Sequence, residues 1–538
     1  MRLFVVLLFP IIVFANEIVL NKSLKEFEES KIFKKHESFS IPKESLDEHK
    51  RLLEVEDDED EKSCIETFKI NIVGNESIKS FDEVVNPYLN RCNGIKNLTN
   101  LRDKISNLYI DKGFITSRAY FLPQDLKSGE ITINIIEGKI ERFEPDGINL
   151  SNLFKSMEGK TLNIKDLEVM LQQAQRLHSQ ELDIEIVPSK KMGHSVVKVF
   201  NVSQEKSYNG NLGINNFGTK KTGKYQIYGQ YNFENFLRMS DIVTINLSST
   251  NRALESRDKT FGTFLNYSTV YDRFSFDIFY SYSNYNQINQ DVFHYDYKSD
   301  GYSFSRGVSA SYKLYHSKHS SLELLAEYEN KKTSSYFENV KLELQSYINS
   351  TVGVGARYGF YGSGFNGYGE LKFHKGIAGE KQEFSKQEIY SKRYILNAGF
   401  NRYFDTPSKL EYNLFIRGQY SRDLLFGTEE ISMGGPYSVR GFNSFGLYGN
   451  RGFFIRNDLL VSQTLGSALL KPYLGLDYGS VSKGSKSFGG EIVGFTFGVK
   501  SYYKNFFADL SCSTPVKESE NIKDENSSFL GFNFSYRY

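Results

Sequence analysis

The chain is poor in the features that mark several common classes of protein. Its 538 residues include no tryptophan and only three cysteines. Lysine plus arginine total 66 and aspartate plus glutamate total 65, so the formal net charge is +1. Without a surplus of positive charge, the chain lacks the electrostatic footprint of a general nucleic-acid binder. The composition therefore predicts no nucleic-acid partner.

Long hydrophobic runs are also missing, except at the N-terminus. Leu3 to Ala15 is apolar but shorter than the roughly 20 residues that a membrane-spanning helix needs. Small residues at Val13 and Ala15 suit a signal peptidase. We interpret residues 1–15 as a secretory signal peptide, with a buried N-terminal helix as the alternative. The mature chain is then expected outside the cytoplasm.

Three cysteines in an exported chain suggest one disulfide and one leftover thiol. Cys64 and Cys92 lie in one segment, whereas Cys512 lies near the opposite end of the sequence. We therefore expect a disulfide between Cys64 and Cys92 in the periplasm.

The first part of the mature chain is strongly polar. Residues 16–36 carry apolar side chains at helical spacing, which predicts an amphipathic helix. Residues 37–62 are predicted to form a linker that ends in the acidic run Glu54–Glu61. Mutual repulsion of its charges favours a solvated tether. A calcium site is the alternative, but no glycine or asparagine is interleaved with the acids.

Residues 63–138 have the pattern of a small α/β domain, and residues 139–203 repeat it. The first segment predicts strands, two helices and two further strands in the order β-α-α-β-β. Its expected elements are strand 68–73, helices 81–89 and 98–112, and strands 117–122 and 130–137. Those of the second segment are strand 140–143, helices 150–157 and 164–177, and strands 182–188 and 195–201. We therefore expect two tandem copies of one module.

Residues 204–538 show a different pattern, in which apolar and polar residues alternate. Phe274, Phe276, Ile278 and Tyr280, for example, are separated by mostly polar residues, which predicts strands with one apolar face. About sixteen such runs, each of about ten residues, are separated by turns. Open sheet edges cannot be satisfied in lipid, so strands that cross a bilayer must close into a barrel. The polar positions expected to face its lumen include Ser275, Asp277, Asn349, Gly353, Asn397 and Asn413.

The strands of a large secreted β-sandwich or adhesin would also show alternating apolar and polar residues. The aromatic content of 15% and the terminal series Phe532, Phe534, Tyr536 and Tyr538 favour the barrel. Phenylalanine and tyrosine would supply the interfacial aromatic girdles. The predicted fold is thus α+β plus membrane β: a helix, two α/β domains, and a 16-stranded antiparallel transmembrane barrel.

Asp111–Gly138 resembles the first polypeptide-transport-associated (POTRA) domain of the two-partner secretion transporters, the TpsB family of hemolysin secretion/activation proteins. The likeness extends over essentially the whole mature chain: plug helix, linker, two POTRA domains and barrel. In the second domain, Leu167, Glu168 and Gln172 are similar to another signature of that family. The residues that match the first signature are Gly113, Thr116, Arg118, Pro123, Gln124, Gly129 and Gly138.

The long connection between Asp423 and Arg451 carries a second likeness. Its Val439, Arg440, Gly441 and Phe442 match the V-R-G-[FY] loop of this family and of the wider superfamily that includes BamA. The resemblance implies that the loop folds back into the barrel, where the arginine meets the aspartate of an F-x-D-x-G segment. Here that segment keeps Asp477 and Gly479 but has Gly475 in place of the phenylalanine. The departure concerns the packing of the loop tip rather than the charge pair.

The resemblance implies an outer-membrane transporter with its POTRA domains in the periplasm. Its client would be a Sec-exported exoprotein of the TpsA type, hemolysin-like or adhesin-like, passed unfolded to the cell surface. Residues 16–36 would plug the lumen at rest, and Tyr538 would direct insertion into lipid by the barrel-assembly machinery. A BamA-like assembly factor is the alternative, although two POTRA domains and a plug favour transport. A passive porin would leave the POTRA segment without a purpose.

No pattern in the sequence points to catalysis. The eight histidines are scattered without metal-ligand spacing, and no G-x-S-x-G or Cys/His arrangement is present. We therefore expect neither an enzyme nor a metal or cofactor site.

Overall fold

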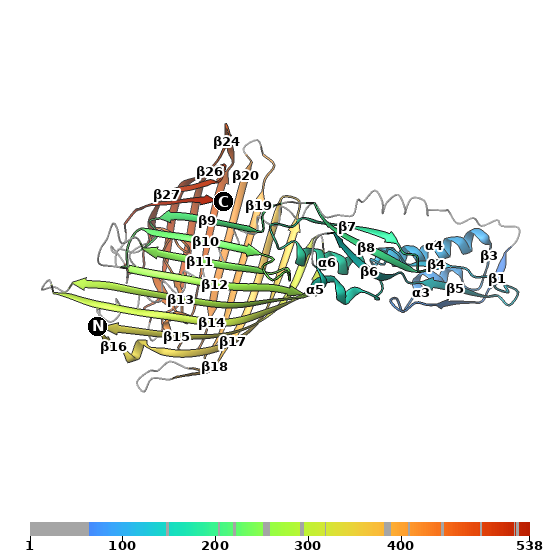
Figure 1. Cartoon of the computed structure of the whole chain (residues 1–538), viewed down its shortest axis with the longest axis horizontal. Helices are drawn as coiled ribbons and strands as arrows, with labels where there is room; N and C mark the ends of the chain where they lie inside the picture. The colour runs from blue at the N-terminus through green and yellow to red at the C-terminus, as the bar shows by residue number, and fades with distance from the viewer. Residues whose placement is uncertain are drawn as a thin grey trace.

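Two small α/β domains lead into a large barrel (Figure 1). The predicted signal peptide, plug helix and linker lie outside the residues that the computed structural model describes. No helix in the described part of the chain is long and apolar enough to cross a membrane. The described residues are 64–538 except 147–149, 203–204, 219–221, 251–258, 291–294, 318, 381–388, 407–408, 443–445, 485–486, 521 and 523–526.

The first domain is a three-stranded sheet covered by one long helix. The sheet order is β2-β5-β4, with β2 parallel and β4 antiparallel to β5. Helix α4 (Ile95–Asp111) packs Leu101, Ile105 and Tyr109 against the sheet, where all three are fully buried. The three strands are β2 (Lys69–Val73), β4 (Arg118–Tyr120) and β5 (Glu130–Ile136).

Two features of this domain differ from the prediction. The first helix, expected over 81–89, is a single turn, α3 (Asp82–Val85), followed by the 3-10 turn Asn86–Tyr88. Pro87 has no N–H to continue an α-helix, which explains the change. A small sheet of β1 (Ile65–Thr67) and β3 (Arg91–Asn93) was not predicted.

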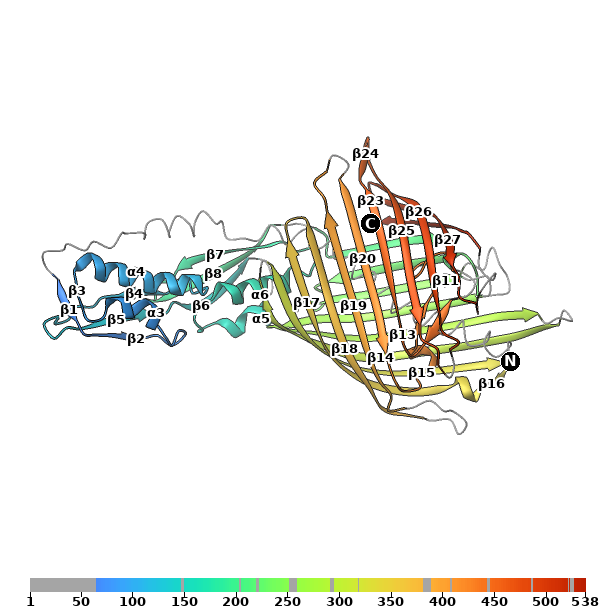
Figure 2. The ribbon, with the colours of Figure 1, turned by 180° about the vertical axis from the view of Figure 1, so that it is seen from behind.

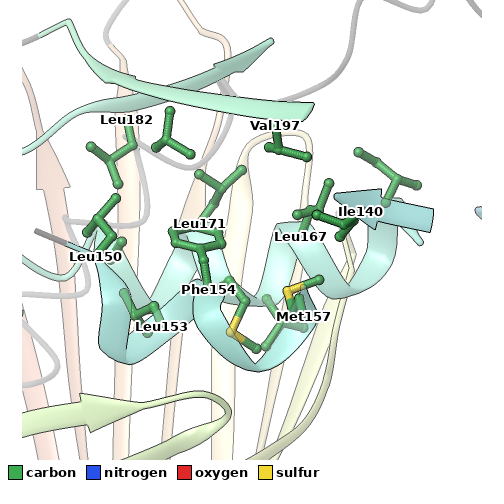
Figure 3. Packing of buried hydrophobic residues seen from close by; sticks show 14 of the residues in the cluster. Ile140, Leu150, Leu153, Phe154, Met157, Leu167, Leu171, Leu182 and Val197 are labelled. Atoms are coloured by element: carbon green, nitrogen blue, oxygen red, sulfur yellow. The ribbon is translucent and has the colours of Figure 1, made fainter. Parts of the chain in front are cut away.

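The second domain repeats this architecture, as the sequence predicts. Its sheet order β6-β8-β7 places the last strand in the middle, parallel to β6 and antiparallel to β7. Figure 3 shows the core, in which Leu167 and Leu171 of one helix meet Leu182 and Val197 of the sheet. Its elements are β6 (Lys139–Asp146), α5 (Ser151–Phe154), the 3-10 turn Lys155–Met157, α6 (Ile164–Ala174), β7 (Leu182–Pro188) and β8 (His194–Asn201).

The remaining strands form a closed antiparallel barrel, which confirms the predicted architecture. Sixteen long strands are described, and short pieces β16 (Val340–Lys341) and β24 (Gln463–Leu465) extend two hairpins. The ring closes between β28 and β9 through five paired residues, fewer than join any other two long neighbours in it. The long strands are β9 (Tyr208–Asn215), β10 (Gln226–Glu234), β11 (Ile242–Thr250), β12 (Lys259–Tyr271), β13 (Phe274–Gln290), β14 (Asp296–His316), β15 (Ser320–Phe337), β17 (Tyr347–Gly362), β18 (Phe365–Glu380), β19 (Lys392–Tyr403), β20 (Leu410–Tyr420), β23 (Gly452–Val461), β25 (Ala468–Val481), β26 (Gly490–Tyr503), β27 (Phe506–Lys517) and β28 (Phe529–Arg537).

The expected strand length of about ten residues is wrong for several of these strands. β13, β14 and β15 have 17, 21 and 18 residues, more than the about 9 to 11 that cross a bilayer. Their far ends project beyond the neighbouring strands (Figure 1). In this part of β13, from Asn284 to Ile288, polar residues occupy both faces. Backbone pairing between these strands therefore extends beyond the region in which apolar and polar residues alternate.

Within the membrane-spanning part, side chains alternate between lipid and lumen. Phe276 and Ile278 are exposed on the outside, whereas Asp277 between them points inward and is half-buried. Asn349 and Asn397 are buried inside the ring. A polar interior and an apolar exterior explain why a membrane protein can have a mean hydropathy of -0.44.

Candidate functional site

The segment between β20 and β23 folds into the barrel and builds a small apolar core there. A hairpin of β21 (Ile431–Met433) and β22 (Leu447–Gly449) frames it. Val439 and Phe442 of the loop are fully buried against the inward-facing Phe415 and Phe454 of the wall. Two phenylalanines that face a polar lumen would be unfavourable without this cover. The loop is therefore a folded part of the barrel interior.

Arg440 forms a bidentate ion pair with Asp477 of β25. Its Nε lies 2.6 Å from Oδ2 and its Nη2 lies 2.7 Å from Oδ1, while its backbone N–H donates to Oδ2 at 3.0 Å. Arg440 is 4% exposed and Asp477 is 0% exposed. Charge-assisted pairs of this geometry are short and directional. The structure thus brings together the two residues that the resemblance paired.

A second carboxylate, Asp458 of β23, was not predicted. Its Oδ1 lies 2.7 Å from Nη2 of Arg440, and Nη2 also donates to the carbonyl oxygen of Asn457 at 3.2 Å. Arg456 lies 3.9 Å from Asp458 and donates to the carbonyl oxygen of Pro436 in the loop at 2.8 Å. Arg440 therefore ties the loop to two neighbouring strands. The alternation of β23 points Arg456 and Asp458 inward, but only the strand register places them beside the loop arginine.

The glycines of the two motifs leave room for close approach. A Cβ on Gly475 would lie 2.2 Å from Nη2 of Arg440, so the phenylalanine of the family pattern does not fit this arrangement. On Gly479 a Cβ would lie 2.5 Å from Sδ of Met433. Gly441 has φ +95°, a conformation that suits glycine. The absence of a side chain at Gly475 is what gives the guanidinium access to Asp458.

The matched POTRA residues act in turns and at the junction of the two domains. Gly113 ends α4 with φ +100°, and its carbonyl oxygen accepts from the N–H of Ile164 in α6 at 2.9 Å. A Cβ on Gly138 would lie 2.2 Å from Oγ1 of Thr116. Gln124 exchanges hydrogen bonds with the backbone of Thr132 at 2.7 and 2.9 Å. These contacts shape the domains rather than a binding pocket.

The remaining matched residues of the first domain also lie in turns and connections or make local backbone contacts. Arg118 donates to the carbonyl oxygens of Ile115 and Ser117, both at 2.8 Å. Gly129 turns into β5 with φ +70°, and Pro123 lies in an exposed connection.

Glu137, which no motif singled out, joins the two domains. It accepts from the backbone N–H of Ser77 at 2.7 Å and from Thr161 of the second domain at 3.3 Å. The hydroxyl of Tyr109 donates to the same carboxylate at 3.0 Å. Burial, followed by this hydrogen bond, raises the pKa of Tyr109 well above its usual value. The phenol therefore stays protonated as a donor.

Cys64 and Cys92 are joined by a disulfide at the end of the molecule far from the barrel. Cys64 directly precedes β1 and Cys92 lies in β3, so the bridge cross-links the two strands of the small sheet. Cys512 of β27 is a free thiol.

The second domain is docked on the near end of the barrel. Arg176, directly after α6, donates to the carbonyl oxygens of Ser240 and Ser268, both at 2.8 Å. Asn152 donates to the carbonyl oxygen of Val270 at 2.6 Å. Gln172, one of the matched residues, accepts from Lys313 of the barrel at 2.5 Å. Helix α6 therefore holds the domain against the turns of β11 to β14.

No described strand pairs with the outer edges of the two small sheets, which are β2 and β4 in the first domain and β6 and β7 in the second. Among the described residues, no group of three or more His, Cys, Asp and Glu side chains is arranged to hold a metal ion.

Comparisons with known proteins identify the family. Residues 193–501, more than half of the chain, match the model of the haemolysin secretion/activation proteins ShlB/FhaC/HecB. Residues 66–138 match the ShlB-type POTRA domain, and residues 132–188 match a further POTRA domain.

Relatives and solved structures agree with this match. The chain is 29% identical to the outer membrane transporter CdiB of Dickeya dadantii over 69% of its own length and 67% of the relative's. It is 28% identical to the hemolysin transporter protein ShlB of Serratia marcescens over 83% and 81% of the two chains. The structure of CdiB from Escherichia coli, 24% identical, superposes with a TM-score of 0.80 over 92% of this chain and 97% of that one, a likeness of fold. The resemblance drawn from the sequence is confirmed: the chain belongs to the haemolysin secretion/activation proteins, outer-membrane transporters built from POTRA domains and a β-barrel.

Proposed function

We propose that this chain takes a large Sec-exported partner of the TpsA type from the periplasm and passes it unfolded through its barrel to the cell surface. The observation that carries the proposal is the loop inside the ring, held by Arg440 on two wall strands. A loop that fills the lumen of a closed barrel and can leave it would control passage of a client through the barrel. The named relatives are transporters rather than enzymes.

The open edges of the POTRA sheets suit an extended client. An unfolded chain can add a strand to such an edge through main-chain hydrogen bonds, largely independently of its sequence. In the second domain, β7 is an edge strand whose free side is not paired by any described strand. We infer that the client is received there before it enters the barrel.

The outer surface suits insertion into outer-membrane lipid. Leu474, Leu476 and Phe497 are among the exposed apolar side chains of the wall, and lipid would cover them. Tyr538, which follows β28, packs its ring 5.7 Å from Tyr231 of β10. We infer that the barrel-assembly machinery recognises this C-terminal strand.

Co-expression with a candidate partner, a large Sec-exported protein from a neighbouring reading frame, tests the proposal. We expect the partner at the cell surface or in the medium only when this chain is present. A variant with proline in place of Ile184 and Ile186 of β7 should reduce export while the barrel still folds. If the partner stays in the periplasm and other barrels fail to assemble without this chain, an assembly factor is the better description.

A further inference from the structure

The loop inside the barrel is attached to the wall at a second place, eleven positions before Arg440 in the sequence. Oε1 of Glu429 lies 2.8 Å from Nη1 of Arg393 and accepts from Nδ2 of Asn349 at 2.8 Å. Gln419 donates to the backbone carbonyl of Glu429, also at 2.8 Å. Glu429 is 6% exposed and Arg393 is 8% exposed. The contact is therefore a buried ion pair between loop and wall, and Glu429 also accepts hydrogen bonds from Asn349 and Gln419.

Neighbouring loop residues strengthen this contact. The hydroxyl of Thr428 lies 2.8 Å from that of Tyr347, and the backbone N–H of Thr428 donates to the same phenol at 3.2 Å. The ring of Phe426 stacks on Tyr347, with their centroids 4.2 Å apart. We call the loop residues Phe426, Thr428 and Glu429, together with Tyr347, Asn349 and Arg393 of the wall, the second anchor.

The second anchor and Arg440 hold the loop on different parts of the wall. Tyr347 and Asn349 begin β17, and Arg393 lies at the start of β19, both at the end of the barrel away from the POTRA domains. Asp458 and Asp477, which bind Arg440, lie within β23 and β25. Figure 2 shows these strands side by side along one wall, from β17 through β20 to β25. Loss of either attachment alone would leave the loop tethered by the other.

Other charged side chains of the wall lie around Arg393. Glu329 of β15 interacts with it through space, and Lys331 lies 3.5 Å from Glu329. His374 of β18 also faces this group and lies 2.9 Å from Glu327. Among the described residues, the carboxylate in direct contact with Arg393 is Glu429, at 2.8 Å.

We propose that the Glu429–Arg393 pair is a latch that holds the loop in the lumen independently of Arg440. Both attachments then have to open before the path is clear. The inference rests on the proposed role of the loop as an obstruction of that path, and it assigns Glu429 and Arg393 as positioning residues.

Accessibility of the loop tip tests the latch without any client. A thiol is placed in the tip as Tyr437→Cys in a Cys512→Ser background, and its reaction with a membrane-impermeant maleimide is timed in proteoliposomes. Because Arg440 also holds the loop, the labelling rates are compared in an Arg440→Ala background, where the latch is the remaining one of the two attachments. Removal of one partner leaves a buried charge unpaired, so Arg393→Gln and Glu429→Gln should each raise the labelling rate in that background by at least about tenfold. The double variant should be no faster than the quicker single variant, since both remove the same interaction.

Arg357→Gln is the matched control, because Arg357 pairs with Glu370 at 2.6 Å within the wall and that pair does not involve the loop. It should change the rate by less than about twofold. Heat-modifiable migration on gels establishes that each barrel is folded. An unchanged rate in either latch variant, an equal rise in Arg357→Gln, or additive effects in the double variant would overturn the proposal. The labelling assay contains no client, so its result does not depend on export. The latch hypothesis and the export hypothesis can therefore fail separately.

Discussion

At the scale of single residues, the site depends on charges removed from water. Arg440 is almost fully buried, is surrounded by two carboxylates and a backbone carbonyl, and lies with its guanidinium directly over Gly475. An isolated buried charge is strongly disfavoured, and removal of one partner from a buried pair costs about 3 to 5 kcal/mol. The ion pairs therefore fix the position of the loop more than the stability of the barrel.

Arg440→Ala is expected to abolish or severely reduce client export. The substitution leaves Asp477 and Asp458 buried without their cation, so the loop tip should leave its position. The barrel should still fold and migrate with heat-modifiable mobility, because the sixteen-strand pairing does not involve this side chain. Normal export by Arg440→Ala, or by Asp477→Ala, would contradict the assigned role.

Gly475→Phe restores the pattern of the family and should nevertheless disturb this chain. The Cβ alone would lie 2.2 Å from Nη2 of Arg440 and 2.8 Å from Oδ1 of Asp458. We expect the loop to shift and the mean conductance in planar bilayers to rise. Gly484→Ala is the control, since a Cβ there has no neighbour within 4 Å. Equal conductance in the two variants would show that Gly475 is not needed for access to Asp458.

At the scale of elements, the alternating pattern predicted the barrel and the repeated pattern predicted the two domains. Asp458 escaped prediction because its partnership depends on the register between β23 and β25, which places it opposite Gly475. The first helix is shorter than predicted because Pro87 ends it. The long ends of β13 to β15 were not predicted, because the strands there stay paired beyond the region in which apolar and polar residues alternate. Periodicity thus indicates which face a residue occupies, whereas a site is built from residues that distant strands bring together.

Docking of the second domain depends on α6, and Arg176→Ala should loosen it. The change leaves the carbonyl oxygens of Ser240 and Ser268 without this donor, at a cost of about 1 to 3 kcal/mol. Limited proteolysis should then cut faster between β8 and β9. Arg142→Ala is the control, because among the described residues the exposed Arg142 forms ion pairs with Glu141 and Glu144 of its own strand and not with the barrel. The same cleavage rate in both variants would argue against a docking role.

A conductance measurement tests the predicted plug directly. Deletion of residues 16–40 should raise conductance in planar bilayers if the amphipathic helix fills the polar lumen. A conductance equal to that of the intact chain would count against a plug.

At the scale of the whole molecule, the domains and the barrel are stabilised by separate means. The first domain has its own apolar core and the Cys64–Cys92 bridge, whereas the barrel has a continuous ladder of strand pairs. Damage to one part should therefore spare the other.

Cys64→Ser tests this separation. Loss of the bridge should destabilise the first domain by about 2 to 4 kcal/mol, seen as faster proteolysis of residues 64–138. The barrel should keep its heat-modifiable mobility. Simultaneous loss of both would show that the domains fold as one unit, and reaction of both thiols in oxidised, exported wild-type protein would contradict the bridge itself.

The short seam between β9 and β28 has a consequence for the order of folding. The hydroxyl of Tyr228 in β10 reaches across β9 to Asn533 of β28 at 2.7 Å, a contact between residues 305 positions apart. Contacts so distant along the chain are slow to form because most of the chain must be ordered first. The ring cannot close before its last strand arrives, so the folding barrel should pass through an open sheet in which the edges of β9 and β28 stay unpaired until that step.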